Sequence, residues 1–305
     1  MARLVFLGTP QAAAPTLELL DENHDVGLVV TQPDRPRGRS AEPMPPPVKE
    51  LAVAHDLPLV QPTSRAELAN AIAAHGPFDV GVVVAFGRIL GPEILTAPEE
   101  GLLNVHFSLL PRWRGAAPVA RALMAGDPMT GVTIIRLDEG LDTGPVVTAQ
   151  AIDIRDDENA GELTNRLATL GARLLVHALP DYLKGSLEPV PQSDDGLTYA
   201  DKIEPMDRPI DSNSDVDSVV ANVRGLAPSP AATLEIDGDI HKILEARVSS
   251  NRSPQLGTWE AVDGVPVVGF RDGGVELVTL QSAGKKPHSG EEWLRGRHRA
   301  RGVVR

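Results

Sequence analysis

Strands that are apolar along their whole length, and that alternate with helices, constrain the fold of this chain most. The run FDVGVVVAFG, residues 78–87, is the strongest of them, and RLVFLG (3–8) and GLLNVHF (101–107) share its character. A strand with one wet face alternates apolar and polar residues, so a continuous apolar run indicates a strand covered on both faces. Helical patterns separate these runs, such as the one over 64–76, for which Ser64 is the predicted N-cap. We therefore predict an α/β fold with a Rossmann-like, mostly parallel sheet and helices on both faces.

The character of the sequence changes near residue 190. The stretch 190–206 is rich in Pro, Asp and Ser, which predicts a linker. A helical pattern over 214–226 follows, and then short Val-rich runs separated by Gly turns. Strands of this length and spacing are typical of a small antiparallel barrel. We predict a first domain over 1–189 and a C-terminal, OB-like β-barrel domain over 207–305.

Composition excludes several classes of protein. The chain has no cysteine, which excludes disulfides, thiolate metal ligands and a cysteine nucleophile. The apolar run at the N-terminus is shorter than the roughly 7–15 residues of a signal peptide. The longest apolar run, VGVVVAFG (80–87), is far shorter than the ~20 residues that span a bilayer. We expect a soluble, cytoplasmic protein without membrane contact, and we expect a monomer.

Charge is distributed unevenly. A net charge of −13 argues by itself against a nucleic-acid partner. The stretch 194–217, however, holds eight Asp/Glu and two Lys/Arg, whereas 285–305 holds seven Lys/Arg and two Glu. A basic stripe can bind phosphates on a protein whose net charge is negative. Nucleic-acid binding therefore stays open.

The first strand–helix turn does not match a dinucleotide-binding motif. GTPQAAAP, residues 8–15, supplies one Gly where the G-x-G-x-x-G pattern needs three. Binding of NAD at this turn is not expected.

The segment NVHFSLLPRWRGAAP, residues 104–118, holds the strongest candidates for chemistry. Asn104 and His106 are two residues apart at the end of a predicted strand, so they share one face, at the edge where parallel sheets bind ligands. An amide and an imidazole could hold a carbonyl oxygen that gains negative charge. A carboxylate in the turn DEGLDTG, with Asp142 the favoured one, could orient the imidazole or collect a proton. The alternative interpretation is a structural histidine and solvated turn acids, and the spacing alone does not decide between the two.

Several motifs together resemble a known family. NVHFSLLPRWRGAAP followed by TGVTIIRLDEGLDTG resembles the folate-dependent formyltransferases that use 10-formyltetrahydrofolate. Further stretches match that family in the same order and span nearly the whole chain: VFLGTP, TQPDRPRGR, PVKELA, VVVAFG, TYADKI and LQSAGKK. LLPRWRGAAP and TQPDRP are narrower matches, and they resemble the members that act on initiator methionyl-tRNA.

The resemblance implies roles for matched positions. Asn104, His106 and Asp142 fall on the family's catalytic trio. The positions expected to contact the folate are Phe86, Gly87, Ser108, Leu109, Leu110 and Pro111. The family usually has Tyr at position 86, and Phe keeps the ring without the polar hydroxyl.

The resemblance also implies the reaction. The formyl group of 10-formyltetrahydrofolate, a cosubstrate, would pass to the α-amine of methionine on initiator methionyl-tRNA, for translation initiation. The amine would attack directly through a tetrahedral intermediate, with no enzyme nucleophile and no metal. In this interpretation 1–189 is the catalytic domain and 207–305 binds tRNA.

Basic residues in two loops are the implied tRNA contacts. They are Arg35, Arg37, Arg39, Lys285 and Lys286. The sequence departs from the family after the first loop, where SAEPMPPP follows and no lysine appears before residue 49, and again at IDSNSD, where relatives often carry Trp.

Other functions stay open at this point. The chain could act on a sugar nucleotide or a purine precursor, or hydrolyse the same folate. The purine enzyme normally lacks a second domain, so residues 207–305 argue against it. A non-catalytic RNA-binding relative is a further alternative. The presence of Asn104, His106 and Asp142 argues against it.

Overall fold

The computed structural model describes residues 1–36, 42–250, 253–297 and 299–304. These residues form two compact units, each built from more than one stretch of the chain. The first unit comprises 1–116, 130–152 and 164–200, and the second comprises 117–129, 153–163 and 201–305. Among the described residues, no helix combines the length and the apolar character that a bilayer crossing requires.

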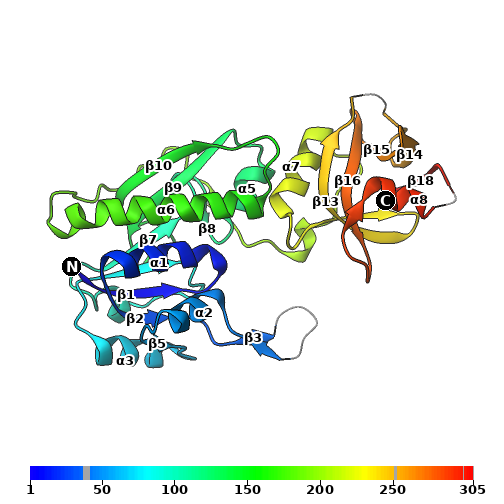
Figure 1. The fold of residues 1–305 in the computed structure, drawn as a ribbon. Helices are drawn as coiled ribbons and strands as arrows, with labels where there is room; N and C mark the ends of the chain where they lie inside the picture. The colour runs from blue at the N-terminus through cyan, green and yellow to red at the C-terminus, as the bar shows by residue number, and fades with distance from the viewer. Residues whose placement is uncertain (37–41, 251–252, 298, 305) are drawn as a thin grey trace. The chain divides into compact units, whose positions relative to one another are not determined.

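A seven-stranded sheet forms the first unit (Figure 1). In spatial order its strands are β10 (Val146–Asp153), β9 (Met129–Arg136), β7 (Leu102–His106), β6 (Val80–Val84), β1 (Arg3–Gly8), β2 (Asp25–Val30) and β5 (Leu59–Val60). The pairs from β7 to β5 are parallel, and β9 runs antiparallel to β7. The prediction of a mostly parallel sheet is confirmed.

Helices cover both faces of this sheet. They are η1 (Gln11–Ala13), α1 (Ala14–Asn23), α2 (Pro47–Ala54), α3 (Arg65–His75), α4 (Pro92–Leu95) and α6 (Ala160–Leu183). Leu68 of α3 and Ile94 of α4 pack in a buried cluster with Leu102 of β7. On the other face, a Cβ added at Gly171 of α6 would lie 2.5 Å from a methyl carbon of Val105, whose side chain leaves β7 on the side opposite to Asn104. The parallel strands are therefore covered on both sides, as their continuous apolar runs predicted.

The cap of α3 is a side-chain hydrogen bond. Ser64 Oγ accepts from the backbone N–H of Glu67 at 3.2 Å, and Glu67 in turn accepts the N–H of Thr63 at 2.7 Å. The first bond satisfies a donor that the first helical turn leaves without a partner, and the second fixes the residue before the cap. The Ser64 signal in the sequence therefore located the start of this helix correctly.

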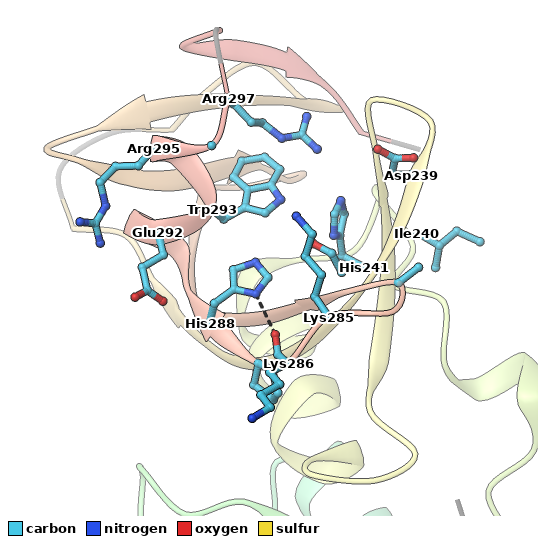
Figure 2. Close-up of a pocket in the computed structure, with 14 residues that line it drawn as sticks. Asp239, Ile240, His241, Lys285, Lys286, His288, Glu292, Trp293, Arg295 and Arg297 are labelled. Carbon is cyan, nitrogen blue, oxygen red and sulfur yellow. Dashed lines mark hydrogen bonds between the residues drawn. The ribbon is translucent and has the colours of Figure 1, made fainter. Parts of the chain in front are cut away.

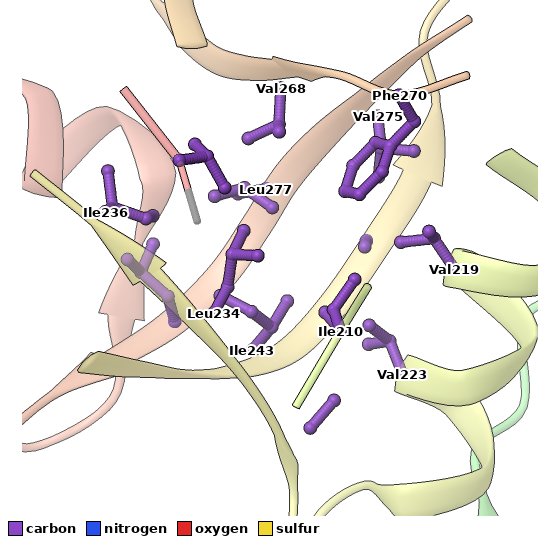
Figure 3. Close-up of a cluster of buried hydrophobic side chains, with 14 of the residues drawn as sticks. Ile210, Val219, Val223, Leu234, Ile236, Ile243, Val268, Phe270, Val275 and Leu277 are labelled. Atoms are coloured by element: carbon purple, nitrogen blue, oxygen red, sulfur yellow. The ribbon is translucent and has the colours of Figure 1, made fainter. Parts of the chain in front are cut away.

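The second unit contains an antiparallel sheet curled around its own core (Figures 1 and 3). In spatial order its strands are β12 (Ala232–Ile236), β13 (Asp239–Val248), β16 (Gly274–Ser282), β15 (Val265–Gly269), β14 (Thr258–Val262) and β18 (Arg301–Val303), with β17 (His288–Ser289) on β16. Ile236 makes an antiparallel bridge to Val304, which joins the two ends of the sheet. The prediction of a small antiparallel barrel is confirmed.

Two tight hairpins organise this barrel. Asp237 and Gly238 join β12 to β13 with φ of 52° and 88°, and Asp263 and Gly264 join β14 to β15 with φ of 50° and 84°. Two consecutive positive φ values at an Asp-Gly pair are the signature of a type I′ turn, whose twist matches that of the flanking strands. The Asp-Gly pairs in the sequence therefore set the register of both hairpins.

Further helical segments belong to the second unit. They are α5 (Pro118–Met124), η2 (Pro205–Asp207), α7 (Val216–Leu226) and α8 (Gly290–Arg295). Val219 and Val223 of α7 face the barrel core beside Phe270 (Figure 3). On α7, a Cβ added at Gly225 would lie 2.8 Å from the Ala120 carbonyl oxygen, so the glycine lets α5 and α7 approach closely. The core of this unit is thus shared by the barrel and one face of α7.

The chain segment expected as a linker lies partly within the first unit. Val190 exchanges two backbone hydrogen bonds with Val146, and β11 (Tyr199–Ala200) pairs with β8 (Arg114–Gly115). The last passage from the first unit to the second falls between residues 200 and 201. Residues 190–200 therefore run along the region that carries the candidate trio.

Candidate active site

The predicted trio comes together at the end of β7. Asn104 and His106 lie on this strand, and Asp142 lies in the loop that joins β9 to β10. Asn104 Nδ2 is 3.5 Å from Asp142 Oδ1, and His106 Nδ1 is 3.7 Å from Asp142 Oδ2. The side chains of His106 and Asp142 are only 6% and 13% exposed. The amide and the imidazole of β7 therefore meet a carboxylate from a distant part of the sequence, in a nearly buried site.

The His106 ring has one nitrogen committed to the backbone. Its Nε2 lies 2.9 Å from the carbonyl oxygen of Trp113. A carbonyl can only accept, so this contact requires a proton on Nε2 and leaves Nδ1 as the nitrogen able to exchange protons. Nδ1 is also the nitrogen that faces Asp142. An imidazole donor was expected here from the sequence, and the structure identifies which nitrogen could serve.

The Asp142 carboxylate is aimed by the backbone around it. Its Oδ2 accepts a hydrogen bond from Gly115 N at 2.9 Å, and its own φ is 52°. Gly115 has a φ of 126°, and an added Cβ would stand 2.7 Å from the Ala200 carbonyl oxygen. Only glycine fits this position without strain. The GAAP part of the motif therefore brings a backbone N–H to the carboxylate.

The loop that carries Asp142 is tightly folded. Asp138 Oδ1 accepts from Gly140 N at 3.0 Å and from Thr143 Oγ1 at 2.7 Å. At the end of the loop, an added Cβ on Gly144 would lie 1.8 Å from the Arg136 carbonyl oxygen. Asp138 thus shapes the loop, and Asp142 is the acid that points toward Asn104 and His106.

Two residues that the sequence motifs did not single out hold this loop from outside. Gln192 Nε2 donates to the carbonyl oxygens of Asp142 at 2.8 Å and Gly144 at 2.7 Å. Gln192 Oε1 accepts from Arg114 Nε at 3.0 Å and Nη2 at 2.7 Å. Arg114 is only 6% exposed, so its guanidinium is buried beside Gln192. In the sequence, the position of Arg114 next to Gly115 was the one feature that could have indicated this arrangement.

The segment expected to contact folate is anchored through its serine. Ser108 is fully buried, its hydroxyl donates to the Arg112 carbonyl oxygen at 2.6 Å, and its own carbonyl accepts from Thr133 Oγ1 at 2.7 Å. Leu109, Leu110 and Pro111 are half-buried. The leucines and proline therefore offer the apolar surface of this segment, while Ser108 holds it in place.

Phe86 and Gly87 lie in the turn that follows β6. The Phe86 ring is 3% exposed and belongs to a buried cluster of the first unit. Its carbonyl accepts from Gln32 Nε2 at 3.0 Å. Gly87 is exposed with a φ of 77°, and an added Cβ would meet open space. A ligand at this turn would contact the backbone or Gly87, because the Phe86 ring is buried.

The first predicted basic loop is described only at its base. Arg35 is exposed on β3 (Arg35–Pro36), which pairs with β4 (Pro43–Met44). Lys49 anchors this base through an ion pair of 2.7 Å with Asp34. Arg37 and Arg39 lie outside the described residues.

The second pair of predicted basic residues borders a cavity of about 990 Å³ in the second unit (Figure 2). Lys285 and Lys286 are exposed in the turn between β16 and β17. Arg297 stacks 3.9 Å from the Trp293 ring centroid and pairs with Asp237, so it supports the barrel. The two lysines are more accessible than Arg297.

His241 forms part of the wall of the same cavity. Its ring stands edge-on to Trp293, with centroids 5.7 Å apart, and neither ring nitrogen has a hydrogen-bond partner among the described residues. Burial, and secondly the positive charge of Arg297, lower the pKa of His241. The ring therefore packs as a neutral group.

Across the part of the chain that the structure describes, no three His, Asp or Glu side chains are placed to hold a metal ion.

The site offers the chemistry of acyl transfer. Asn104 has a second amide N–H beyond the one directed at Asp142, and it can donate to an oxygen on the substrate. His106 Nδ1, when protonated, can donate to the same region. Such preorganised donors stabilise an oxygen that becomes negative during attack on a carbonyl. None of these three groups is a hydroxyl or a thiol.

Comparisons with known proteins agree with this chemistry. Residues 2–179 match the formyl transferase family, and residues 202–298 match the formyl transferase C-terminal domain. The methionyl-tRNA formyltransferase of Halorhodospira halophila is 45% identical over 300 residues, covering 97% of this chain and 96% of that protein. The methionyl-tRNA formyltransferase of Parvibaculum lavamentivorans is 41% identical and covers 96% of both.

Solved structures share the fold at lower identity. An N-formyltransferase from Helicobacter canadensis, in complex with folinic acid and dTDP-3-aminofucose, has a TM-score of 0.71 and 17% identity, covering 92% of this chain and 100% of that one. HypX from Aquifex aeolicus in complex with tetrahydrofolic acid has a TM-score of 0.66 and 18% identity, and the match covers 96% of this chain and 47% of HypX. From its motifs, its fold and its full-length relatives, the chain belongs to the formyl transferase family.

Proposed function

We propose that this protein transfers the formyl group of 10-formyltetrahydrofolate to the α-amine of methionine on initiator methionyl-tRNA. The observation that carries the proposal is the convergence of Asn104, His106 and Asp142 within 3.5–3.7 Å. Identity of 41–45% to methionyl-tRNA formyltransferases over 96–97% of the chain favours a tRNA substrate over a sugar nucleotide or a purine precursor. Because initiator tRNA is charged and used in the cytoplasm, we expect the protein to act there.

The proposed mechanism is direct transfer. Asn104 and protonated His106 donate hydrogen bonds to the formyl oxygen while the methionine amine attacks the formyl carbon. A single donor of this kind is worth about 3 kcal/mol in the transition state. The new C–N bond forms, the bond from the formyl carbon to N10 of the folate breaks, and the amine proton passes to N10. Asp142 supports the charged imidazole and, with it, relays this proton.

The folate would lie against the segment next to His106. Leu109, Leu110 and Pro111 supply apolar surface for its ring system, and Ser108 fixes the backbone of that segment. Gly87 supplies an open backbone position at the turn after β6, and the Phe86 ring next to it in sequence is buried in the core of the first unit. These contacts bind and orient the donor, whereas the trio performs the transfer.

The decisive experiment is an assay of formyl transfer. The purified protein is incubated with 10-formyltetrahydrofolate and methionine-charged initiator tRNA, beside uncharged tRNA and a dTDP-amino sugar. Formyl-methionine on the charged tRNA is the expected product. Formylation of the sugar alone would replace the proposed substrate, and release of formate without any acceptor would indicate a hydrolase.

Lys285 and Lys286 are proposed to bind tRNA phosphates, and they give a separate prediction. Replacing both with alanine is expected to raise KM for the tRNA while leaving kcat near that of the wild type, because neither lysine belongs to the trio. The slope of log KM against log salt should flatten by up to about two, roughly one for each lysine that binds a phosphate. Measurements at several salt concentrations check this.

Lys184 provides the matched control for that experiment. It is exposed at the end of α6, and Lys184→Ala removes a lysine charge outside the proposed tRNA contacts. We expect its KM and salt dependence to equal those of the wild type. Equal KM values for the double lysine variant and the control would remove Lys285 and Lys286 from the tRNA-binding surface.

A further inference from the structure

Gln192 lies between a buried cation and the loop that carries Asp142. Its amide makes four hydrogen bonds: two accepted from Arg114 and two donated, to the carbonyl oxygens of Asp142 and Gly144. Both amide protons and the amide oxygen are therefore used. We propose that Gln192 is a positioning residue for formyl transfer, which holds the Asp142 loop in the conformation that aims the carboxylate at His106.

The orientation of the Gln192 amide follows from its partners. The Arg114 guanidinium has only donors, and the two backbone carbonyls have only acceptors. A flipped amide would place donor against donor and acceptor against acceptor, so one orientation alone satisfies all four contacts. The bonds from Arg114 are also charge-assisted, which strengthens them. Gln192 thus links Arg114 to the Asp142 loop in one fixed orientation.

The residues on both sides of Gln192 are fixed as well. Before it, Val190 exchanges backbone hydrogen bonds of 2.7 and 2.8 Å with Val146, at the start of β10. After it, Thr198 accepts the N–H of Trp113 through its hydroxyl at 2.9 Å and the N–H of Arg114 through its carbonyl at 3.0 Å. The segment 190–198 therefore ties the end of the Asp142 loop to the strand that supplies Gly115.

The conformation that Gln192 holds has a cost of its own. Asp142 has a φ of 52°, in the left-handed region, which Asp adopts more readily than most residues but less readily than glycine. Such a conformation persists where surrounding contacts impose it. Gln192 binds the carbonyl of Asp142 itself, while Gly115 N binds its carboxylate. Backbone and side chain of the same residue are therefore held from two directions.

The inference rests on the proposed function and is tested through Asp142. Gln192→Ala removes all four hydrogen bonds. Gln192→Glu keeps the shape of the side chain and its pairing with Arg114, but it sets a carboxylate oxygen against the two loop carbonyl oxygens. For both variants we expect kcat to fall about 10- to 100-fold, the scale of an approximately 1 Å misplacement of a catalytic group, with KM for folate and tRNA within about twofold of the wild type. Gln150→Glu, the same chemical change at an exposed position of β10, is the control and should be neutral.

A double-mutant cycle separates positioning from a general structural role. In an Asp142→Asn background, Gln192→Ala should lower kcat by less than about twofold, because residues that act as one unit are not additive. An equal loss of kcat in both backgrounds, or a rise in KM with kcat unchanged, would overturn the proposal. If Gln192→Ala does not fold, the isosteric Gln192→Glu variant provides the cycle.

Amide hydrogen exchange gives a readout that does not depend on activity. Residues 138–144 should exchange faster in Gln192→Ala and Gln192→Glu than in the wild type or in Gln150→Glu. Unchanged hydrogen exchange in this loop would overturn the proposal that Gln192 holds it, even if activity falls. Absence of formyl transfer by the wild-type protein would instead overturn the proposed function, so the two failures are distinguishable.

Discussion

Asp142→Ala is expected to lower kcat by about 10²- to 10³-fold, the largest effect on activity that the structure predicts. The carboxylate faces both Asn104 and His106, at 3.5 and 3.7 Å. Its removal takes the carboxylate away from His106 Nδ1 and leaves the Gly115 N–H without its acceptor. Asp142 is not among the proposed folate contacts, so KM for the folate should change little. Steady-state kinetics with both substrates varied measures this.

A neighbouring acid supplies the control for Asp142. Glu139 is exposed in the same loop, and Glu139→Ala should keep wild-type kcat. Asp142→Asn keeps the size of the side chain and an acceptor for Gly115, so a loss close to that of the alanine variant would assign the effect to the negative charge. Near-normal turnover of Asp142→Ala would remove the residue from the mechanism and favour the interpretation of a solvated turn acid.

Trp259→Ala is expected to destabilise the second unit by about 3–5 kcal/mol, the usual cost of removing a large buried aromatic side chain. Trp259 is fully buried, packs edge-on against Trp293 at 5.0 Å between ring centroids, and donates from Nε1 to Asp237 Oδ2 at 3.2 Å. Its removal creates a cavity in the barrel core and takes one donor from the Asp237 carboxylate. The free energy of unfolding, from denaturant titration followed by circular dichroism, measures the change.

The same variant separates the proposed tasks of the two units. If the barrel binds tRNA and the first unit binds folate, Trp259→Ala should weaken tRNA binding while calorimetry still detects folate binding. Val248→Ala, at a 45% exposed position of β13, is the control and should change stability by less than about 0.5 kcal/mol. A stability loss below about 1 kcal/mol for Trp259→Ala would show that the barrel core does not depend on this ring.

Much of the fold was predictable because the signals are local. Continuous apolar runs, helical periodicity and the Ser64 cap depend on residues close in sequence, and each produced the element that the structure contains. The shared face of Asn104 and His106 follows from the two-residue repeat of a strand. Family motifs added Asp142, which spacing left open among three acids.

Other features depended on contacts between distant segments. No local pattern distinguishes Arg114, which is buried beside Gln192, from the half-buried Arg112 two residues earlier. Gln192 stands in a Pro- and Asp-rich stretch that was interpreted as a linker, yet backbone pairing at Val190 and Thr198 brings it to the Asp142 loop.

The sequence by itself determined the element types and the fold class, because periodicity and capping act within a few residues, and its resemblance to a family supplied the candidate trio. Only the tertiary structure decided which nitrogen of His106 is free, where Asp142 points and what holds it there. Those outcomes depend on the Trp113 carbonyl, the Gly115 N–H and the Gln192 amide. The first two become partners only when the loops close, and the third lies 50 residues along the chain from the Asp142 carbonyl that it binds.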